Sequence, residues 1–399
     1  YAGCHDVPVE VETFEALLSP EGQRLLEQVR AAAGESDLAL GERLRRTYDP
    51  DLVAAGVSQA RLRTRARPKL GEDAGRMYFT ADGLEQATRA GVAAHRVRRL
   101  VASGVTGVVD LGCGIGGDLV AVARAGLDAH GVDLDPLRVA VARANLEALG
   151  LRGTVEAADA TSVPVPAGRT AFADPARRSR GRRLFDPRQC EPPWDFVTGL
   201  LSGQAVVKTM PGIAHGLVPD RVEAEWVSEG GDLVEACLWG APLAGARRRA
   251  TLLPSGDTLT EADDPGRTET AEMRAYLYEP DDAVTRAGLV TAVAALTDGS
   301  LVDPHLAYVS SDRLVGTPFA RAYRVLEELP YREKQLRAAL RARDVGTLTV
   351  KKRGVQVVPE QLVARLGLRG SRTATVVLTR VGGAGRAYLV DPLPRDSDV

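Results

Sequence analysis

Short apolar runs alternate with amphipathic stretches between residues 76 and 253. Five apolar runs have the length of strands: GVVDLG (107–112), DAHGVD (128–133), GTVEAAD (153–159), TAFAD (170–174) and QAVVK (204–208). The first two are followed by DLVAVARAGL and PLRVAVARANLEALG, in which apolar residues recur at helical spacing. Strands that alternate with helices predict crossover units and a parallel, doubly wound α/β sheet with helices on both faces. After Lys208, DLVEACLWG and ARRRATLL predict a hairpin at the edge of that sheet.

Residues 1–75 have a different pattern, which predicts a helical region. In LLSPEGQRLLEQVRAAAG, Ser19 suits the N-cap of a helix, Pro20 suits its first turn, and leucines and valine recur at helical spacing. The basic run RLRTRARPK (61–69) closes this region. Such a run is either a solvated helix face or a phosphate contact.

The polar stretch PSGDTLTEADDPGRTETAE (254–272) predicts a linker over 254–275. Beyond it, DDAVTRAGLVTAVAAL and YREKQLRAALRAR are helical in pattern, while GTLTV, ATVVLTR and RAYLV are strand-like. Residues 331–386 hold thirteen Lys or Arg against three acids, Glu333, Asp344 and Glu360. We therefore expect a basic α/β domain over 276–399, in addition to an α/β domain over 76–253.

Composition narrows the function classes. The chain has 399 residues, 44% hydrophobic residues and a formal net charge of −2, which is typical of a globular protein with two or three domains. Four cysteines, at 4, 113, 190 and 237, are widely spaced, so neither a zinc site nor a disulfide framework is indicated. The histidines have no metal-ligand spacing, and we expect no metal. No apolar run reaches the roughly 18 residues of a membrane span and no signal peptide is visible, so a cytoplasmic protein is expected.

A glycine-rich loop, VVDLGCGIGGD (108–118), joins the first predicted strand to a helix. Glycines there let the backbone turn tightly and approach a ligand. Gly112, Gly114 and Gly117 also fit the GxGxxG pattern of nicotinamide-binding folds, with an acid downstream. The loop alone therefore leaves two ligand classes open.

Acids at three successive strand ends favour a ligand other than a dinucleotide. Asp110 lies inside the first strand, where it suits a cationic amino-acid group better than a pyrophosphate. Asp133 ends the second strand, where a ribose diol would lie, and Asp159 follows the third, near an adenine amino group. A ligand with an ammonium, a ribose and an adenine but no phosphate is S-adenosylmethionine.

In this order and spacing, DLGCGIGGD, GVDLDPLRVAVARANLEALG and AADAT resemble the motifs of class I methyltransferases, which have a Rossmann-like fold. The upstream MYFTADGLEQATRAGVAAHRVRRL (77–100) is similar to the segment before the glycine loop in trimethylguanosine-synthase-like RNA methyltransferases. YLYEPDDAV, LTVKKRGV and ATVVLTRV resemble a bacterial branch that carries a THUMP-like domain. The resemblance implies S-adenosylmethionine as cofactor, RNA as substrate and an RNA-docking domain at 276–399. The cofactor-binding residues expected are Asp110, Gly112, Gly114, Gly116, Asp133 and Asp159.

Asp174 ends the fourth predicted strand, and the resemblance places it in the substrate motif of nucleic-acid methyltransferases. Enzymes that methylate amino nitrogens often have an acid or amide followed by two prolines and an aromatic. This chain reads Asp174-Pro175-Ala176-Arg177, so it keeps the acid and the first proline only. The same residues resemble enzymes that methylate uracil carbon 5, but those need a cysteine after the fifth strand, where VVKTMPG (206–212) has none. We therefore expect transfer to a base nitrogen, with the Asp174 side chain and the Pro175 carbonyl as acceptors.

Basic residues cluster after that motif and near the C-terminus. We expect phosphate contacts from Arg177, Arg178, Arg180, Arg182 and Arg183, although a solvated loop would have the same composition. Lys208 either faces the same pocket or pairs with an acid, and Lys351 and Lys352 offer a second phosphate contact.

The sequence thus predicts an S-adenosylmethionine-dependent enzyme that methylates a structured RNA, such as tRNA. Two alternatives stay open. One is a methyltransferase for a small molecule or a protein. The other is a non-catalytic RNA-binding scaffold that retains the cofactor pocket.

Overall fold

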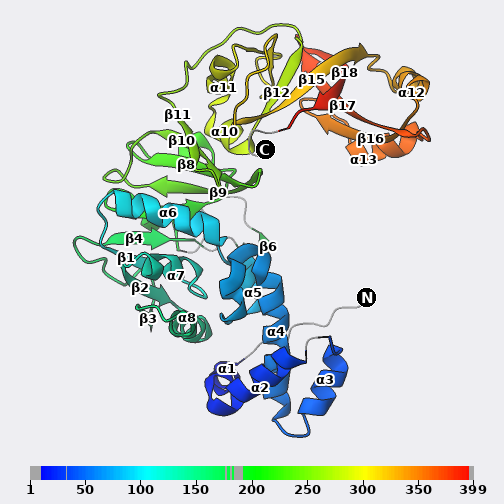
Figure 1. Cartoon of the computed structure of the whole chain (residues 1–399). Coiled ribbons are helices and arrows are strands. Elements are labelled where there is room, and N and C mark those ends of the chain that lie inside the picture. The colour runs from blue at the N-terminus through cyan, green and yellow to red at the C-terminus, as the bar shows by residue number, and fades with distance from the viewer. Residues whose placement is uncertain (1–9, 33, 176–177, 180–181, 184–191, 395–399) are drawn as a thin grey trace. The chain divides into compact units, whose positions relative to one another are not determined.

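The computed structural model describes residues 10–32, 34–175, 192–394 and, for the backbone alone, 178–179 and 182–183 (Figure 1). The chain divides into two compact units. The first comprises Tyr1–Val222 with Cys237–Ala244, and the second comprises Glu223–Ala236 with Gly245–Val399.

The first unit begins with the helical region that the pattern predicted. Its helices are α1 (Val11–Leu18), α2 (Pro20–Ala31), α3 (Asp37–Leu44) and α4 (Pro50–Leu70), and the 3₁₀ helix η1 (Gly71–Gly75), α5 (Ala81–Gln86) and α6 (Ala90–Ala102) follow. The expected cap of α2 is confirmed, because the Ser19 side chain accepts a hydrogen bond from the Gly22 N–H at 3.2 Å. Phe14 and Leu62 of these helices share one buried core with Val108 and Val141 of the following α/β region.

The basic run at 61–69 lies in the last turns of α4. Arg63 Nε donates to the Met77 carbonyl at 2.8 Å. Lys69 Nζ donates to the carbonyls of Leu84 and Glu85 at 2.8 and 2.9 Å. Two cations of the run therefore attach α4 to the segment that precedes the sheet.

The parallel sheet of the first unit is as predicted. Its strands are β1 (Gly107–Leu111), β2 (Asp128–Asp133), β3 (Thr154–Ala157), β4 (Thr170–Ala173) and β7 (Ala205–Thr209), in the order β7-β4-β1-β2-β3. All neighbouring pairs in this order are parallel. The connecting helices are α7 (Gly117–Arg124), α8 (Pro136–Leu149) and α9 (Trp194–Leu200). Strand order reverses between β1 and β4, which is where ligands bind in open α/β sheets.

The second unit opens with strands that the pattern misjudged. Strand β10 (Arg248–Leu253) pairs parallel with β8 (Glu223–Glu229) on one side and antiparallel with β11 (Asp257–Thr260) on the other. The predicted hairpin between 232–240 and 246–253 is therefore wrong, since both edges of β10 are occupied by other strands. Strand β9 (Asp232–Trp239) has residues in both units. Strand β11 lies within the stretch 254–275 that we expected to be a linker.

Strand β8 was missed because its sequence, EAEWVSE, reads as exposed. Glu223 is fully buried and accepts hydrogen bonds from the Gly245 N–H at 2.7 Å and from Arg249 at 2.7 Å. Glu225 is also buried and accepts a hydrogen bond from Thr251 at 2.6 Å. Paired acids thus replace the apolar residues expected of a buried strand.

The rest of the second unit is a mixed sheet with helices. Its strands, in sheet order, are β13 (Ser300–Leu301), β14 (Val309–Ser311), β12 (Tyr276–Pro280), β15 (Ala320–Leu329), β18 (Ala384–Pro392), β17 (Arg372–Val381) and β16 (Val345–Lys352). Helices α12 (Glu333–Ala342) and α13 (Pro359–Leu366) pack their leucines on β16 and β17. The predicted helix at 281–296 is two helices, α10 (Asp282–Ala287) and α11 (Val290–Leu296), because Gly288 adopts a left-handed conformation between them.

In the described part of the chain, no helix has both the length and the apolar character that crossing a membrane requires.

Candidate active site

The glycine loop leaves β1 at Leu111 and enters α7 at Gly117. Gly112, Gly114 and Gly116 have φ angles of +98°, +55° and +81°, a region that favours glycine. The N–H of Gly112 donates to the Val132 carbonyl at 2.8 Å, which holds the loop against the end of β2. A Cβ added at Gly112 or Gly114 would meet no heavy atom within 4 Å, so the space over the loop is open.

Asp110 lies at the carboxyl end of β1 and is only 2% exposed. Its Oδ1 atom is buried and has no hydrogen-bond partner within the described residues. Burial raises the pKa of Asp110 well above its usual value, and the negative charges of Asp118 and Asp174 raise it further. A buried, unpaired carboxylate oxygen next to an open loop is what a bound cation would satisfy.

Asp133 lies at the end of β2 and organises the loop. Its Oδ2 accepts a hydrogen bond from the Gly114 N–H at 2.9 Å, and its Oδ1 accepts one from the Asp135 N–H at 3.0 Å. Asp159, beyond the end of β3, is exposed and accepts hydrogen bonds from the N–H and hydroxyl of Thr161 at 2.8 and 2.7 Å. These bonds lower the pKa of Asp159. The structure thus places both acids at the strand ends where the sequence predicted them.

Asp174 belongs to a network of charged side chains. Its Oδ2 accepts a hydrogen bond at 2.6 Å from Nζ of Lys208, a residue of β7 that is 7% exposed. The same Nζ donates to Thr88 Oγ1 at 3.0 Å, and Thr88 donates to Asp118 Oδ2 at 2.6 Å. Asp118 also pairs with Arg96. Lys208 therefore has an acid as its partner, one of the two roles that the sequence left open.

The network favours the ionised form of Asp118. Burial acts to raise the pKa of Asp118, but Arg96 and Lys208 outweigh it and hold this pKa below its usual value. The Arg96 guanidinium also lies 4.6 Å from the centre of the Phe172 ring, on β4. Asp174, in contrast to its partner Lys208, keeps 26% of its side chain exposed.

Three residues of this network were not predicted as site residues: Thr88, Arg96 and Asp118. Of these residues, only Asp118 could have been found from the sequence, because it is the last residue of the glycine-rich motif at 108–118. Thr88 and Arg96 meet Lys208 and Asp118 through contacts between residues 22 to 120 positions apart, which no local pattern reveals. Lys69, in the basic run at 61–69, also lies near this site, and burial together with the positive charges of Lys208 and Arg89 lowers its pKa to about 8.

The predicted phosphate contacts have different outcomes. Arg177 and Arg180 lie outside the described residues. Arg178, Arg182 and Arg183 lie in the two-stranded ladder of β5 (Arg178–Ser179) and β6 (Arg182–Arg183). In the second unit, Lys351 Nζ bonds to Glu279 Oε2 at 3.0 Å, and Lys352 is exposed.

Two other chemistries have little support here. Cys113, in the loop, is buried, and burial raises the pKa of its thiol, so it is a poor nucleophile. Within the described residues no three His, Cys, Asp or Glu side chains gather as they would around a metal ion.

Comparison with known proteins identifies the family. Residues 108–173, from β1 to β4, match a methyltransferase domain. Over 352 residues, the chain is 40% identical to an uncharacterized S-adenosylmethionine-dependent methyltransferase found in two strains of Mycobacterium tuberculosis. That alignment covers 86% of this chain and 96% of the relative. The chain belongs to the S-adenosylmethionine-dependent methyltransferases.

The other parts of this methyltransferase match further families. Residues 320–392 match the THUMP domain-like family, which confirms the expected THUMP-like character of the C-terminal part. Residues 10–66 match a domain of unknown function. The fold is shared with a protein of Porphyromonas gingivalis that is provisionally named a methyltransferase. The TM-score is 0.73 and the sequence identity is 20%, and the match covers 92% of this chain and 96% of that one.

The cofactor of this methyltransferase is S-adenosylmethionine, and the site fits it. The cofactor brings an ammonium group, a ribose and an adenine. The orphaned Asp110 oxygen and the open space over Gly112 and Gly114 accommodate a cationic group and a ligand that lies close to the backbone. The nicotinamide alternative is thereby set aside.

Proposed function

We propose that this methyltransferase methylates a base nitrogen of a structured RNA, such as tRNA, with Asp174 as the residue that receives the nitrogen. The observation that carries the proposal is the Asp174–Lys208 pair at 2.6 Å, at the carboxyl ends of β4 and β7. This is the edge of the sheet at which ligands bind. We also infer that the enzyme belongs to the trimethylguanosine-synthase-like group, on the basis of residues 77–100.

The cofactor is held by the residues at the other strand ends. Asp110 accepts its ammonium group, Asp133 its ribose hydroxyls and Asp159 its adenine amino group. Gly112, Gly114 and Gly116 let the backbone approach it. When bound, the cofactor supplies an electrophilic methyl group on a sulfonium. The base nitrogen held at Asp174 would receive that methyl group, and the sulfonium would become a neutral thioether.

Lys208 decides which role Asp174 plays. Asp174 Oδ2 already accepts a hydrogen bond from Lys208 Nζ at 2.6 Å, which holds the carboxyl group in one position. Asp174 therefore acts as a fixed hydrogen-bond acceptor. It orients the amine and stabilises the positive charge that develops on the nitrogen as it attacks. The Pro175 carbonyl serves as a second acceptor, and the proton leaves to Asp174 or to water after transfer.

The RNA substrate is supported by the second unit and by the arginines after Asp174. The THUMP domain-like match covers 320–392 and so includes residues 331–386, which hold thirteen Lys or Arg against three acids. Lys352 is exposed at the end of β16, where a phosphate would reach it. Arg177, Arg178, Arg180, Arg182 and Arg183 would contact phosphates next to the reactive base.

Labelled S-adenosylmethionine and unmodified total RNA test this function. The protein is incubated with both, the RNA is digested, and the labelled nucleoside is identified. We expect a nucleoside methylated on a base nitrogen, and no label with the Asp174→Ala variant. Label on a small molecule or a protein would favour the first alternative, and cofactor binding without any transfer would favour a scaffold. Label on uracil carbon 5 would contradict the role of Asp174.

A further inference from the structure

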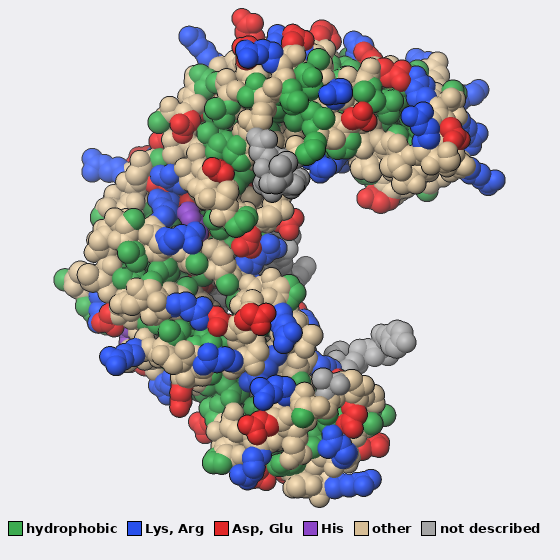
Figure 2. All heavy atoms as spheres, in the orientation of Figure 1, with side chains coloured by type: hydrophobic (Ala, Val, Ile, Leu, Met, Phe, Trp, Pro, Cys, Tyr) green, Lys and Arg blue, Asp and Glu red, His purple; other side chains and the backbone are tan. Residues whose placement is uncertain are grey.

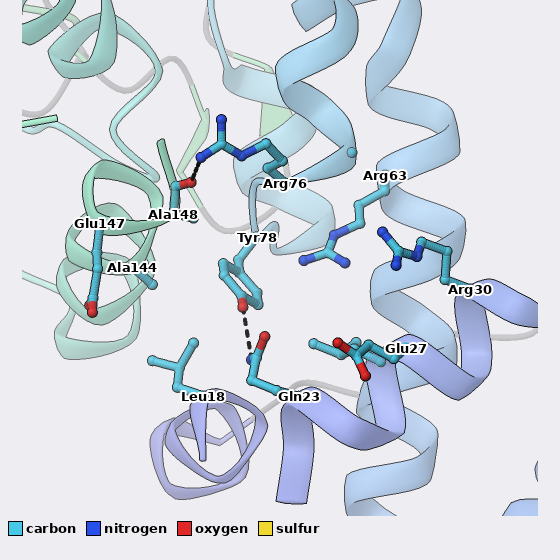
Figure 3. A pocket seen from close by; sticks show the side chains of 12 residues that line it. Leu18, Gln23, Glu27, Arg30, Arg63, Arg76, Tyr78, Ala144, Glu147 and Ala148 are labelled. Atoms are coloured by element: carbon cyan, nitrogen blue, oxygen red, sulfur yellow. Dashed lines mark hydrogen bonds between the residues drawn. The ribbon is translucent and has the colours of Figure 1, made fainter. Parts of the chain in front are cut away.

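A cavity lies in the first unit, between α2, α4 and α8 (Figure 3). Its volume is about 470 Å³, within the roughly 300–1,000 Å³ of small-molecule sites. Arg30 of α2, Arg63 of α4 and Arg76, which follows η1, line it together with Tyr78. Among the described residues that line it, none is an acid at the end of β1, β2 or β4. The cavity is therefore separate from the methyl-transfer site.

Arg63 brings a positive charge to this cavity without a carboxylate to balance it. Its Nε donates to the Met77 carbonyl at 2.8 Å, and its guanidinium carbon lies 5.0 Å from the centre of the Tyr78 ring. Within the described residues, no Asp or Glu oxygen lies within 4.0 Å of its nitrogens. Burial lowers the pKa of Arg63 most and the positive charge of Arg30 lowers it further, against an opposing effect of Tyr78. A half-buried cation next to another cation is stabilised by an anion.

The other two arginines of the cavity, Arg30 and Arg76, also lack an acidic partner among the described residues. Arg30 is exposed and forms no ion pair within the described part of the chain. Its guanidinium group points toward that of Arg63, and the Arg63 guanidinium lies between Arg30 and the ring of Tyr78 (Figure 3). Arg76 donates to a neutral partner, the carbonyl of Ala148 on α8. None of the three cations is therefore neutralised by a neighbouring acid.

Two acids also line the cavity, Glu27 on α2 and Glu147 on α8, and both are exposed. Three arginines against two acids leave the lining with one positive charge. In Figure 3, Glu147 lies across the cavity from Arg30 and Arg63, whereas Glu27 lies on the same helix as Arg30. Water screens exposed carboxylates more than it screens a half-buried guanidinium, so the arginine side of the cavity stays positive.

We propose that this cavity binds the phosphate group of a ligand of nucleotide size, held by Arg30 and Arg63. Guanidinium groups bind phosphate through paired, charge-assisted hydrogen bonds. Leu26 and Ala144, which are buried, provide an apolar wall for a sugar or a base. The phosphate comes either from a free ribonucleotide or from an RNA chain. The second source rests on the proposed function, and the first does not.

Calorimetric titration of the full-length protein tests the proposal. Excess S-adenosylhomocysteine is present throughout, so that the cofactor site takes up no nucleotide. The probes are adenosine 5′-monophosphate, a four-nucleotide RNA and, as the uncharged control, adenosine. We expect saturable one-to-one binding of the monophosphate or of the oligonucleotide, and none of adenosine. Binding of the oligonucleotide alone would assign the phosphate to an RNA chain.

Three substitutions on α2 localise that binding. Arg30→Gln should weaken it about tenfold or more, the effect of losing one charge-assisted hydrogen bond. Glu27→Gln should strengthen it, because it removes a nearby negative charge. Arg24→Gln is the matched control, an exposed arginine of the same helix that does not line the cavity, and it should change nothing.

The proposal is overturned if neither phosphate probe binds, if adenosine binds equally well, or if Arg30→Gln and Arg24→Gln bind alike. Thermal unfolding of each variant shows that it is folded. No methyl transfer is measured in this experiment. If the protein did not methylate RNA, the proposed phosphate site in the cavity would be unaffected. If the cavity did not bind phosphate, the proposed methyl transfer would be unaffected.

Discussion

At the residue scale, the central feature is an acid that is hydrogen-bonded to a buried lysine. Lys208 is 7% exposed, and Asp174 and Thr88 accept hydrogen bonds from its Nζ at 2.6 and 3.0 Å. Removing one member of such a pair leaves the other charge uncompensated. The pair therefore contributes both to stability and to the chemistry that we assign to Asp174.

Replacing Lys208 tests this coupling. We expect Lys208→Met to lower the free energy of unfolding by about 1–3 kcal/mol, because Asp174 loses its partner in a partly buried position. The double variant Asp174→Asn with Lys208→Met should recover part of that loss, since no charge is left unpaired. Urea denaturation of the wild type, of both single variants and of the double variant measures both effects. Additive losses in the double variant would show that the two side chains are not coupled.

The raised pKa of Asp110 predicts how cofactor affinity depends on pH. In the free protein Asp110 retains its proton at a pH where an ordinary aspartate has lost it. An ammonium group favours the carboxylate, so binding expels the proton and is weakened as the pH falls through the raised pKa. We expect the affinity for S-adenosylhomocysteine to decrease as the pH falls through the raised pKa of Asp110, at pH values where an ordinary aspartate is still ionised.

The control for that experiment is Asp110→Asn, which has no carboxyl proton to lose at this position. Its affinity should be lower than that of the wild type and should change less with pH. Titration calorimetry at several pH values gives both profiles. Parallel profiles for the two proteins would show that another group causes the dependence.

At the element scale, one buried side chain on α8 joins three segments around the cofactor loop. Asn145 is fully buried. Its Oδ1 accepts a hydrogen bond from the Tyr78 N–H at 2.7 Å, and its Nδ2 donates to the carbonyls of Tyr78 and Ile115 at 3.1 and 2.8 Å. Ile115 lies in the glycine loop and Tyr78 lies in the segment that follows η1. Asn145 therefore connects α8 to both of them.

Asn145→Leu should therefore affect both stability and cofactor binding. It leaves three buried backbone groups without partners, and we expect the free energy of unfolding to fall by about 3 kcal/mol or more. The affinity for S-adenosylmethionine should fall as well, because the loop loses an anchor. Gln28→Leu is the control, since Gln28 donates at 2.8 Å to Tyr48 from an exposed position where water replaces the bond. Equal losses in the two variants would contradict this account.

The same scale shows what the sequence could and could not predict. The five strands of the first unit and the helices α7 and α8 followed from apolar patterns, and the acids at the ends of β1 to β3 followed from their position. Strand β8 did not, because Glu223 and Glu225 are buried with polar partners. The Asp174–Lys208 contact joins residues 34 positions apart. Such contacts depend on strand order, which a local pattern does not contain.

At the scale of the whole molecule, positive charge is distributed over surfaces of both units (Figure 2). Net charge is near zero, so RNA binding depends on which cations are free to meet phosphates. Two neighbouring lysines of β16 differ in this respect. Lys351 pairs with Glu279, whose pKa it holds below the usual value against the effect of burial, while Lys352 is exposed.

These two lysines give a matched pair of substitutions for RNA binding. Lys352→Met should weaken binding to RNA and reduce by about one the slope of log affinity against log salt concentration. Lys351→Met should act mainly on stability, because it leaves Glu279 half buried without its cation. Salt titrations of RNA affinity and thermal unfolding separate the two effects. Equal salt slopes in Lys352→Met and the wild type would remove this lysine from the RNA contact.

The most direct test of the central claim compares the wild type with Asp174→Ala in one assay. Binding of S-adenosylmethionine and methyl transfer to RNA are measured on the same preparations. We predict that the variant loses transfer by about 100-fold or more, while its cofactor affinity changes little, because the proposed function assigns Asp174 to the substrate and not to the cofactor. Loss of cofactor affinity with intact transfer at saturating cofactor would contradict the account.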